Sequence, residues 1–559
     1  MWGRYALLLA LCALQACRPS TKHEPEASKT APPEPVKVGP SAPPVPGGMT
    51  DRVLVNRYAY IPAQCYTKTR DGTGKAKNPC YACHIHSEPP NFVEDADLQL
   101  QWSFHPLAAK NHWANLFDLP VMRAARERDE DILAYVRQRN YFDAEGRIAL
   151  AQTLSSLPKE WDASDDGKWD GYIPDAWFSF DDQGYDHRPD GTPTGWRAFA
   201  YAPFVGTFFP TNGSFDDVLV RLDPMLRQDR DGHPDNRIYE TNLAIVSALV
   251  TRTNVDIEPV DETALGVDLD LDGKLGRASR VTFDKGRMHW VGRASQEEQA
   301  GRFPISVGLF PLGTEFLHSV RYLDIATDGT VVMAPRMKEL RYAKKARWFS
   351  ADDLRKHAAS ELVEQIESPD GALPVLWQID RGIYNNQGWL LQGFIEAADG
   401  SLRPQSYEET AYCAGCHGEI GRTTDSIFSF PRKRGYYHWT QHDLRGMSEP
   451  RTADGQYEYT RYLRENGGGD ELRENREVID RFFDAHGELR SKEVALLHKD
   501  ISTLLLPSGP RALDLNRAYH AIVKEQTFAR GRDAVLAPST HVYADAPRGE
   551  KTGIARPLR

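Results

Sequence analysis

Apolar and polar residues follow one pattern in the middle of the chain and another near its C-terminal end. Short apolar runs separated by Gly, Pro, Asp and Asn fill residues 151–400, which is typical of strands joined by turns. Beyond residue 470 the apolar positions recur every three to four residues, which predicts amphipathic helices over 473–485, 491–505 and 513–529. We therefore expect a β-rich middle and a helical C-terminal region.

Single elements are predicted from these runs and from residues typical of helix starts. Ser350 and Asp353 predict a helix over 351–366 inside the β-rich region. Ser406 and Glu409 have the spacing of a capping box, which predicts a second helix beginning there. The β-type runs are expected at 197–209, 280–283, 305–310 and 330–333.

The N-terminus has the pattern of an export signal. Arg4 precedes an apolar run too short to span a bilayer, and residues 14–17 read Leu-Gln-Ala-Cys. These four residues resemble the lipobox of bacterial lipoproteins, which implies cleavage before Cys17 and acylation of that cysteine. In that family Arg18, in place of an aspartate, favours the outer membrane, facing either the periplasm or the cell surface. An ordinary secretory peptide is the alternative, and residues 19–48 are Pro-rich and typical of an extended tether.

Length and charge limit the classes of partner. The chain has 559 residues, with 68 Lys and Arg against 79 Asp and Glu. Its net charge of -11 is dispersed without a long basic run, which argues against nucleic acid as the main partner. A chain of this length exceeds what one hydrophobic core normally supports, so two or three cores are expected.

Two Cys-x-x-Cys-His motifs, at residues 80–84 and 413–417, carry the most specific chemistry. A c-type haem needs two thiols, one for each vinyl group, and an iron ligand on the same side. A zinc knuckle or a thioredoxin-like redox pair is the main rival for such a motif. The predicted attachment residues are Cys80, Cys83, Cys413 and Cys416, and the predicted proximal iron ligands are His84 and His417.

The two motifs resemble those of c-type cytochromes, which implies covalent haem and electron transfer. The residue on the opposite side of each iron is left open by the sequence. For the first haem His105 is preferred and His112 is the alternative. For the second haem Met447 competes with His438 or His442 and with an open site. A filled site passes electrons, whereas an open site binds small ligands.

Three short motifs outside the haem sites resemble an uncharacterised family of large predicted cytochrome lipoproteins, and this resemblance implies no activity. The motifs are Trp169-Asp170-Gly171-Tyr172, Thr211-Asn212-Gly213-Ser214 and Gly393-Phe394-Ile395-Glu396.

Acidic turns in the middle of the chain are candidates for a calcium site. Asp268, Asp270 and Asp272 alternate before a glycine, as in a calcium loop, although Ser279 stands where an EF-hand would have its glutamate. Solvated Asp-Gly turns are the alternative. Two similar turns contain Asp229, Asp231 and Asp235, and Asp165, Asp166 and Asp170.

The predicted fold class is α+β, with mostly helical haem regions at both ends flanking the β-rich middle and the two haems brought together in space. The predicted domains are a signal peptide (1–16), a tether (17–50), a first haem region (51–150), the β-rich region (151–400), a second haem region (401–470) and a helical region (471–559).

The predicted function is electron transfer by a lipid-anchored dihaem cytochrome between redox proteins of the cell envelope. Its cofactors are two covalent haem c groups, with calcium as a further candidate. One alternative is a haem enzyme resembling dihaem peroxidases, with one open iron. The other alternative is a calcium-stabilised binding module with the haems as its electrical output.

Overall fold

A large antiparallel sheet organises the part of the chain that the computed structural model describes. The described residues are 69–70, 76–77, 90, 125–204, 213–367, 377–385, 387–406, 409–410, 413, 417, 423–433, 439–452, 454–466 and 476–526. The chain divides after Gly39 into two units, and all described residues belong to the second unit.

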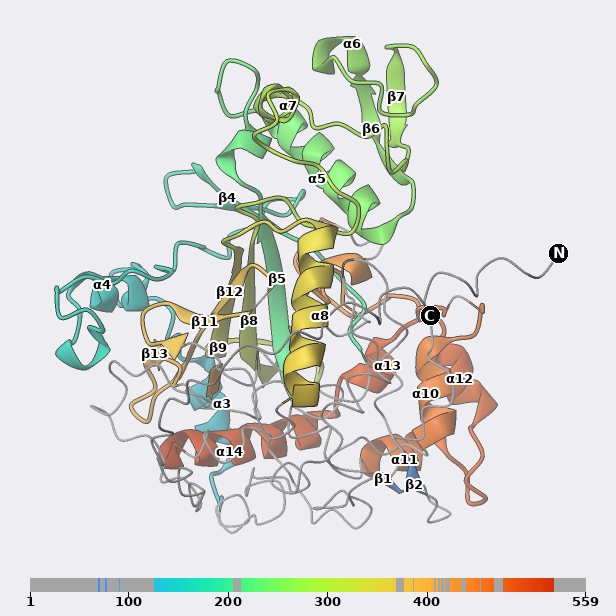
Figure 1. Cartoon of the computed structure of the whole chain (residues 1–559). Helices are drawn as coiled ribbons and strands as arrows, with labels where there is room; N and C mark the ends of the chain where they lie inside the picture. Colours follow the sequence, from blue (N-terminus) through green and yellow to red (C-terminus); the bar gives the residue numbers. More distant parts are fainter. Residues whose placement is uncertain are drawn as a thin grey trace, which may run out of the picture. The chain divides into compact units, whose positions relative to one another are not determined.

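Nine described strands form this sheet in the order β10-β11-β12-β9-β8-β5-β4-β3, with β13 paired to β12 (Figure 1). The strands are β3 (Tyr185–His187), β4 (Pro193–Ala198), β5 (Phe215–Arg221), β8 (Glu315–Ile325), β9 (Val331–Lys345), β10 (Trp377–Gln378), β11 (Gly382–Tyr384), β12 (Trp389–Glu396) and β13 (Leu402–Pro404). Two smaller described pairs are β1 (Thr69–Arg70) with β2 (Ala76–Lys77), and β6 (Val255–Asp261) with β7 (Arg277–Val281).

The strands of the sheet bury side chains on both faces. On β5, Val218 and Val220 belong to one apolar cluster and Leu219 to another. On β12, Leu391 belongs to the first cluster and Phe394 to the second. Because successive side chains of a strand point to opposite faces, the sheet separates two cores. The expectation of more than one hydrophobic core is confirmed.

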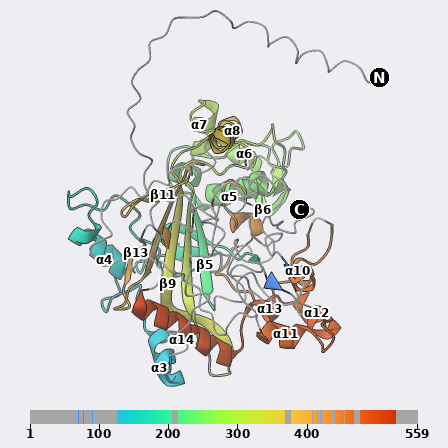
Figure 2. The same cartoon turned by 60° about the horizontal axis from the view of Figure 1, so that its bottom comes forward.

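The described helices surround the sheet. They are α3 (Asp129–Arg137), α4 (Ala149–Ser155), α5 (Asn236–Thr251), α6 (Glu262–Leu265), α7 (Arg293–Gln299), α8 (Ala351–Glu367), α10 (Glu458–Asn466), α11 (Arg476–Phe482), α12 (Ser491–Leu497), α13 (Ser502–Leu505) and α14 (Gly509–Glu525). Helix α14 lies across one end of the long strands (Figures 1 and 2). Asn516 of α14 exchanges hydrogen bonds with the backbone of Leu323 on β8, at 2.7 and 3.3 Å.

The predicted fold class is wrong for the described part of the chain. The expected helical haem regions at both ends are not the organising feature, because strands from Tyr185 to Pro404 form one sheet against which α3 and α14 pack. The first haem region falls almost entirely outside the described residues. The C-terminal helix joins the core of the sheet, because its Leu515 and Tyr519 bury against Tyr322.

Several predicted elements are confirmed with shifted bounds. The helix at 351–366 is α8. The Ser350 N–H donates to Asp353 Oδ2 at 3.0 Å and the Asp353 N–H donates to Ser350 Oγ at 3.2 Å, which are the reciprocal bonds of a capping box. The run at 280–283 overlaps the end of β7, and the run at 330–333 overlaps the start of β9. The predicted helix 491–505 is broken into α12 and α13, and Asp500, between them, accepts from the N–H of Ser502, the first residue of α13, at 3.0 Å.

Two predictions in the β-rich region are wrong. The run 305–310 forms no strand; its Phe310 is apolar because it is fully buried in the core. The sequence predicts α5 as part of the β-rich region, whereas the segment is a helix that Asp235 caps by accepting from Arg237 N and Ile238 N. Helix α5 is buried on nearly all sides, so its sequence lacks the polar stripe that a surface helix shows.

Glycines of two short motifs allow close backbone packing beside β12. A Cβ on Gly171 would lie 1.7 Å from the Asp380 carbonyl oxygen, and one on Gly393 would lie 1.9 Å from Gln405 Oε1. The Tyr172 N–H next to Gly171 donates to Gln392 Oε1 at 2.8 Å. These motifs therefore serve packing of the sheet.

Candidate functional site

The second Cys-x-x-Cys-His motif follows a helix start that forms as predicted. The Ser406 N–H donates to Glu409 Oε2 at 2.7 Å, and the Glu409 N–H donates to Ser406 Oγ at 3.4 Å. These reciprocal bonds are those of a capping box. Arg403 donates to both carboxylate oxygens of Glu409 at 2.9 Å. The predicted start at Ser406 is confirmed. The motif therefore follows a helix start whose residues are buried and held by hydrogen bonds.

His417 is oriented by a hydrogen bond of its ring nitrogen Nδ1. This nitrogen lies 2.7 Å from the Ser426 carbonyl oxygen, and the His417 backbone N–H donates to the Cys413 carbonyl at 2.7 Å. Burial, together with the charges of Arg341 and His318, lowers the pKa of His417 to about 4 despite the bond to Ser426. A neutral ring that donates its Nδ1–H to a carbonyl leaves Nε2 available to a metal. His417 and Cys413 therefore fit a c-type haem.

The Ser426 carbonyl is presented by a tight turn without glycine. Thr424 and Ile427 exchange backbone hydrogen bonds of 3.1 and 2.9 Å, with Asp425 at φ 48° and Ser426 at φ 68° between them. Two successive positive φ values are those of a type I′ turn, which favours Asn and Gly. The Asp425 carboxylate accepts from Lys345 Nζ at 2.6 Å, and both side chains are fully buried. The turn is thus tied to the end of β9.

A second buried group of polar side chains surrounds Asp216 on β5. Asp216 Oδ2 accepts from the Tyr201 hydroxyl at 2.5 Å and lies 2.7 Å from His318 Nε2 on β8. His442 stacks on the Tyr201 ring with 4.5 Å between centroids, and its Nε2 lies 3.5 Å from Asp216 Oδ1. The Tyr201 N–H donates to His442 Nδ1 at 3.3 Å. The result is a compact cluster of one carboxylate, one phenol and two imidazoles.

The Asp216 cluster favours an ionised carboxylate. Burial alone would raise the pKa of Asp216, but the adjacent His442 ring and the hydrogen bonds from His318 and Tyr201 lower it to about 2. His318 also lies opposite Arg341 in the β8–β9 pair, and both charges act on His417. The cluster is therefore electrostatically connected to the candidate iron ligand.

An acidic loop between α6 and β7 contains two of the three predicted calcium residues in one group. Carboxylate oxygens of Glu262, Asp268 and Asp270 lie within 4.8 Å of one another, whereas Asp272 is not in this group. Asp268 Oδ1 is buried, and no hydrogen-bond donor reaches it from the described residues. Burial, with the charges of Glu262, Asp272 and Asp268, raises the pKa of Asp270. Such an arrangement suits a cation with oxygen ligands.

Glu262 is the residue of this loop that sequence reasoning missed. The calcium-loop pattern directs attention to a position after the aspartates, where Ser279 stands. Glu262 lies before them, at the start of α6, and its fully buried carboxylate accepts from the N–H groups of Leu269 and Gly276. The strand β7 follows the loop where an EF-hand would continue as a helix.

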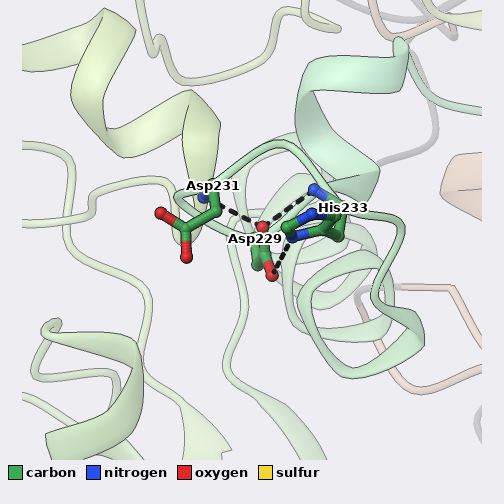
Figure 3. Close-up of side chains that lie close together, drawn as sticks. All are labelled: Asp229, Asp231 and His233. Carbon is green, nitrogen blue, oxygen red and sulfur yellow. Dashed lines mark hydrogen bonds and ion pairs between the residues drawn. The ribbon is translucent and has the colours of Figure 1, made fainter.

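The Asp229 turn is satisfied by its own backbone. Asp229 Oδ1 accepts from the N–H groups of Asp231 and His233, at 2.9 Å each, as Figure 3 shows. The Asp229 pKa is lowered by these bonds. Asp235 is occupied as the cap of α5, and Asp170 pairs with Arg381 at 2.5 Å. These turns are explained by local structure.

Comparison with known proteins identifies the family. The model of a family described as "-like lipoprotein" matches residues 49–499. The chain belongs to this lipoprotein family. The lipoprotein is also 29% identical, over 527 residues, to an uncharacterized lipoprotein of Aquifex aeolicus (strain VF5). The alignment covers 85% of each chain. No solved structure matches the lipoprotein.

Family membership supports the part of the N-terminal prediction that concerns lipid. The lipoprotein is a membrane-anchored protein of the cell envelope. Cys17, the predicted acylation site, lies outside the described residues. No helix in the described part of the lipoprotein has the length and apolar character needed to cross a membrane.

The remaining predicted site residues are either in separate surroundings or outside the described residues. Met447 is fully buried with Leu444 and Tyr459 in a cluster different from the one against which Cys413 packs. His442 belongs to the Asp216 cluster. The predicted residues outside the described part of the lipoprotein are Cys80, Cys83, His84, His105, His112, Cys416 and His438.

Proposed function

We propose that the lipoprotein is a dihaem c-type cytochrome that transfers electrons between redox proteins of the cell envelope. The observation that carries this proposal is the state of His417, whose ring is neutral and donates Nδ1–H to the Ser426 carbonyl. This is the state that an imidazole needs to ligate iron through Nε2. Each haem would supply one iron that changes between two oxidation states by one electron.

The residues of the lipoprotein would hold and insulate such a haem. Cys413 packs against the large apolar cluster of the sheet, which contains Phe310, Phe430 and Trp389. Phe428 meets the His417 ring edge to face with 5.6 Å between centroids. An apolar shell lowers the local dielectric constant and so influences the potential of a bound redox centre. The position of the anchor, on the outer membrane with the protein facing the periplasm or the cell surface, is part of the same proposal.

The proposal predicts the haem content of defined variants. The wild-type protein is expected to carry two covalent haems, and the double variant Cys413→Ala/Cys416→Ala one haem, because the thiols of the second motif are removed. The measurement is the pyridine haemochrome spectrum per protein, with haem staining after denaturing electrophoresis. A wild-type protein without covalent haem would contradict the proposal. Two low-spin irons that ignore peroxide and carbon monoxide would exclude the peroxidase-like alternative.

We further propose that the acidic loop binds calcium and stabilises the β6–β7 region. Two observations support this proposal: Asp268 Oδ1 is buried with no donor among the described residues, and carboxylate oxygens of Glu262 and Asp270 lie close to Asp268. Calcium at a hundredfold excess over its Kd is expected to stabilise the metal-free protein by about 3 kcal/mol. Asp270→Asn should abolish this gain, and the control Asp229→Asn should keep it. The measurement is thermal unfolding with and without calcium, and equal gains in both variants would contradict a site at Asp270.

A further inference from the structure

The turn that presents the Ser426 carbonyl to His417 is held by a pair of charges that the fold could do without. Lys345 and Asp425 are both fully inaccessible to solvent. Burying an ion pair has a desolvation cost that often exceeds the attraction, and an apolar pair of similar volume is frequently as stable. The position of this pair therefore needs a reason other than stability.

Its hydrogen bonds give a geometric reason. Lys345 Nζ donates to Asp425 Oδ1 at 2.6 Å and to the Gln387 carbonyl at 2.8 Å. Asp425 Oδ2 accepts from the Phe310 N–H at 3.0 Å. Ser426 Oγ donates to Gln387 Oε1 at 3.1 Å. The turn is thus fastened to β9, to the loop at Phe310 and to the segment before β12.

The fastened turn holds a conformation that its own residues disfavour. Asp425 and Ser426 both have positive φ, which non-glycine residues adopt in succession only when surrounding contacts hold them there. This conformation points the Ser426 carbonyl at His417, so that the carbonyl oxygen lies 2.7 Å from His417 Nδ1. Asn385 Nδ2 donates to the His417 carbonyl at 2.7 Å and fixes the backbone of the same residue.

We propose that Lys345 and Asp425 are positioning residues that set the strength of the Ser426–His417 hydrogen bond and thereby the potential of the haem bound at the second motif. This inference rests on the proposed function. A strong bond to Nδ1 makes the imidazole a stronger electron donor, which stabilises oxidised iron and lowers the potential. Releasing the turn weakens the bond and raises the potential.

The direction in which the haem potential shifts distinguishes an effect of turn positioning from a direct effect of the removed charge. A negative charge near the iron stabilises the oxidised state, so its loss in Asp425→Asn raises the potential by either route. A positive charge does the opposite, so by charge alone Lys345→Met would lower the potential. Positioning predicts that Lys345→Met raises it, because the same turn is released. Lys345→Met is therefore the deciding variant.

The experiment is a redox titration of the full-length, haem-loaded protein, with spin resonance of the oxidised form. Both variants are expected to keep two haems, to raise the potential of one haem only and to change its spin-resonance signal. Ser426→Ala keeps both charges but removes the hydrogen bond from Ser426 Oγ to Gln387 that helps to hold the turn, so it should raise the same potential by less; it decides the question if the charge variants do not fold. The control Asp175→Asn breaks an ion pair with Arg221 among residues of the other core and should leave both potentials unchanged.

Two outcomes would overturn the inference. Opposite shifts in Lys345→Met and Asp425→Asn would mean that the pair acts by charge alone, and unchanged potentials in all three turn variants would mean that it does not act on the haem. The haem content of the wild-type protein distinguishes a failure of this inference from a failure of the proposed function. A wild-type protein that lacks the second haem would overturn both.

Discussion

Replacement of Glu396 by glutamine is expected to destabilise the protein by about 3–5 kcal/mol, the cost of breaking a buried charged network. Glu396, at the end of β12, is fully buried. Its carboxylate accepts from the Tyr135 hydroxyl at 2.6 Å, the Tyr322 hydroxyl at 2.7 Å and Arg336 Nε at 2.5 Å. These partners come from α3, β8 and β9, so this one side chain of β12 links helix α3 to the sheet and cross-links two further strands of it.

Glutamine keeps the shape of Glu396 and one acceptor oxygen but loses the other acceptor oxygen. One carboxylate oxygen becomes an NH₂ group, which would face a donor, and the charge that balances Arg336 is lost. Arg336 is nearly inaccessible, so it would remain as a buried cation with weakened compensation. The measurement is urea unfolding at pH 7 followed by circular dichroism. Glu297→Gln, which breaks an exposed pair with Arg302, is the control and should change little. A loss below about 1 kcal/mol for Glu396→Gln would contradict the importance of this network.

Local signals in the sequence predicted helix starts well. The predicted helix starts at Ser350 and at Ser406 both form, because each depends on residues within three positions of one another. The third C-terminal helix was placed late, since α14 begins at Gly509 and Ser508 caps it by accepting from the Arg511 N–H. Its early residues include Pro510 and Arg511, which weakened the apolar pattern there.

The longest strand shows why the sheet was harder to predict. β9 continues to Lys345, far beyond its apolar start, and includes the charged residues Arg336, Lys338 and Glu339, all of which are buried. Lys338 donates to the Gly213 carbonyl and to Ser214 Oγ, and Arg336 pairs with Glu396. Polar residues in a strand normally indicate a solvent-exposed face. Here their partners lie on distant segments, which no local pattern reveals.

The candidate site divides in the same way. The two Cys-x-x-Cys-His motifs are contiguous in the chain, so their proposed haem-attachment residues can be predicted from the sequence alone. The support around His417 is assembled from Lys345, Asp425 and Ser426 by tertiary packing. Asp216 and His318 meet because β5 pairs with β8, and this pairing could not be predicted from either strand alone.

Replacement of Asp216 by asparagine is expected to destabilise the protein at pH 7 by about 2.5 kcal/mol and to reduce its loss of stability in acid. The carboxyl pKa is lowered to about 2 in the folded protein. The ordinary value is about 3.9, and each unit of difference corresponds to about 1.4 kcal/mol. Because the folded pKa is the lower one, this stabilisation is fully present above about pH 4. It is lost as the pH falls through about 2.

The cluster around Asp216 provides a graded control. Tyr201→Phe removes the hydroxyl that donates to Asp216 but keeps the carboxylate and both imidazoles, so a loss of about 1 kcal/mol is expected. The free energy of unfolding is measured in urea from pH 7 to pH 2 for both variants and the wild type. The gap between Asp216→Asn and the wild type should narrow steadily below pH 4. Curves that stay parallel down to pH 2 would mean that Asp216 has an ordinary pKa. In that case the imidazoles of His318 and His442 do not stabilise its charge.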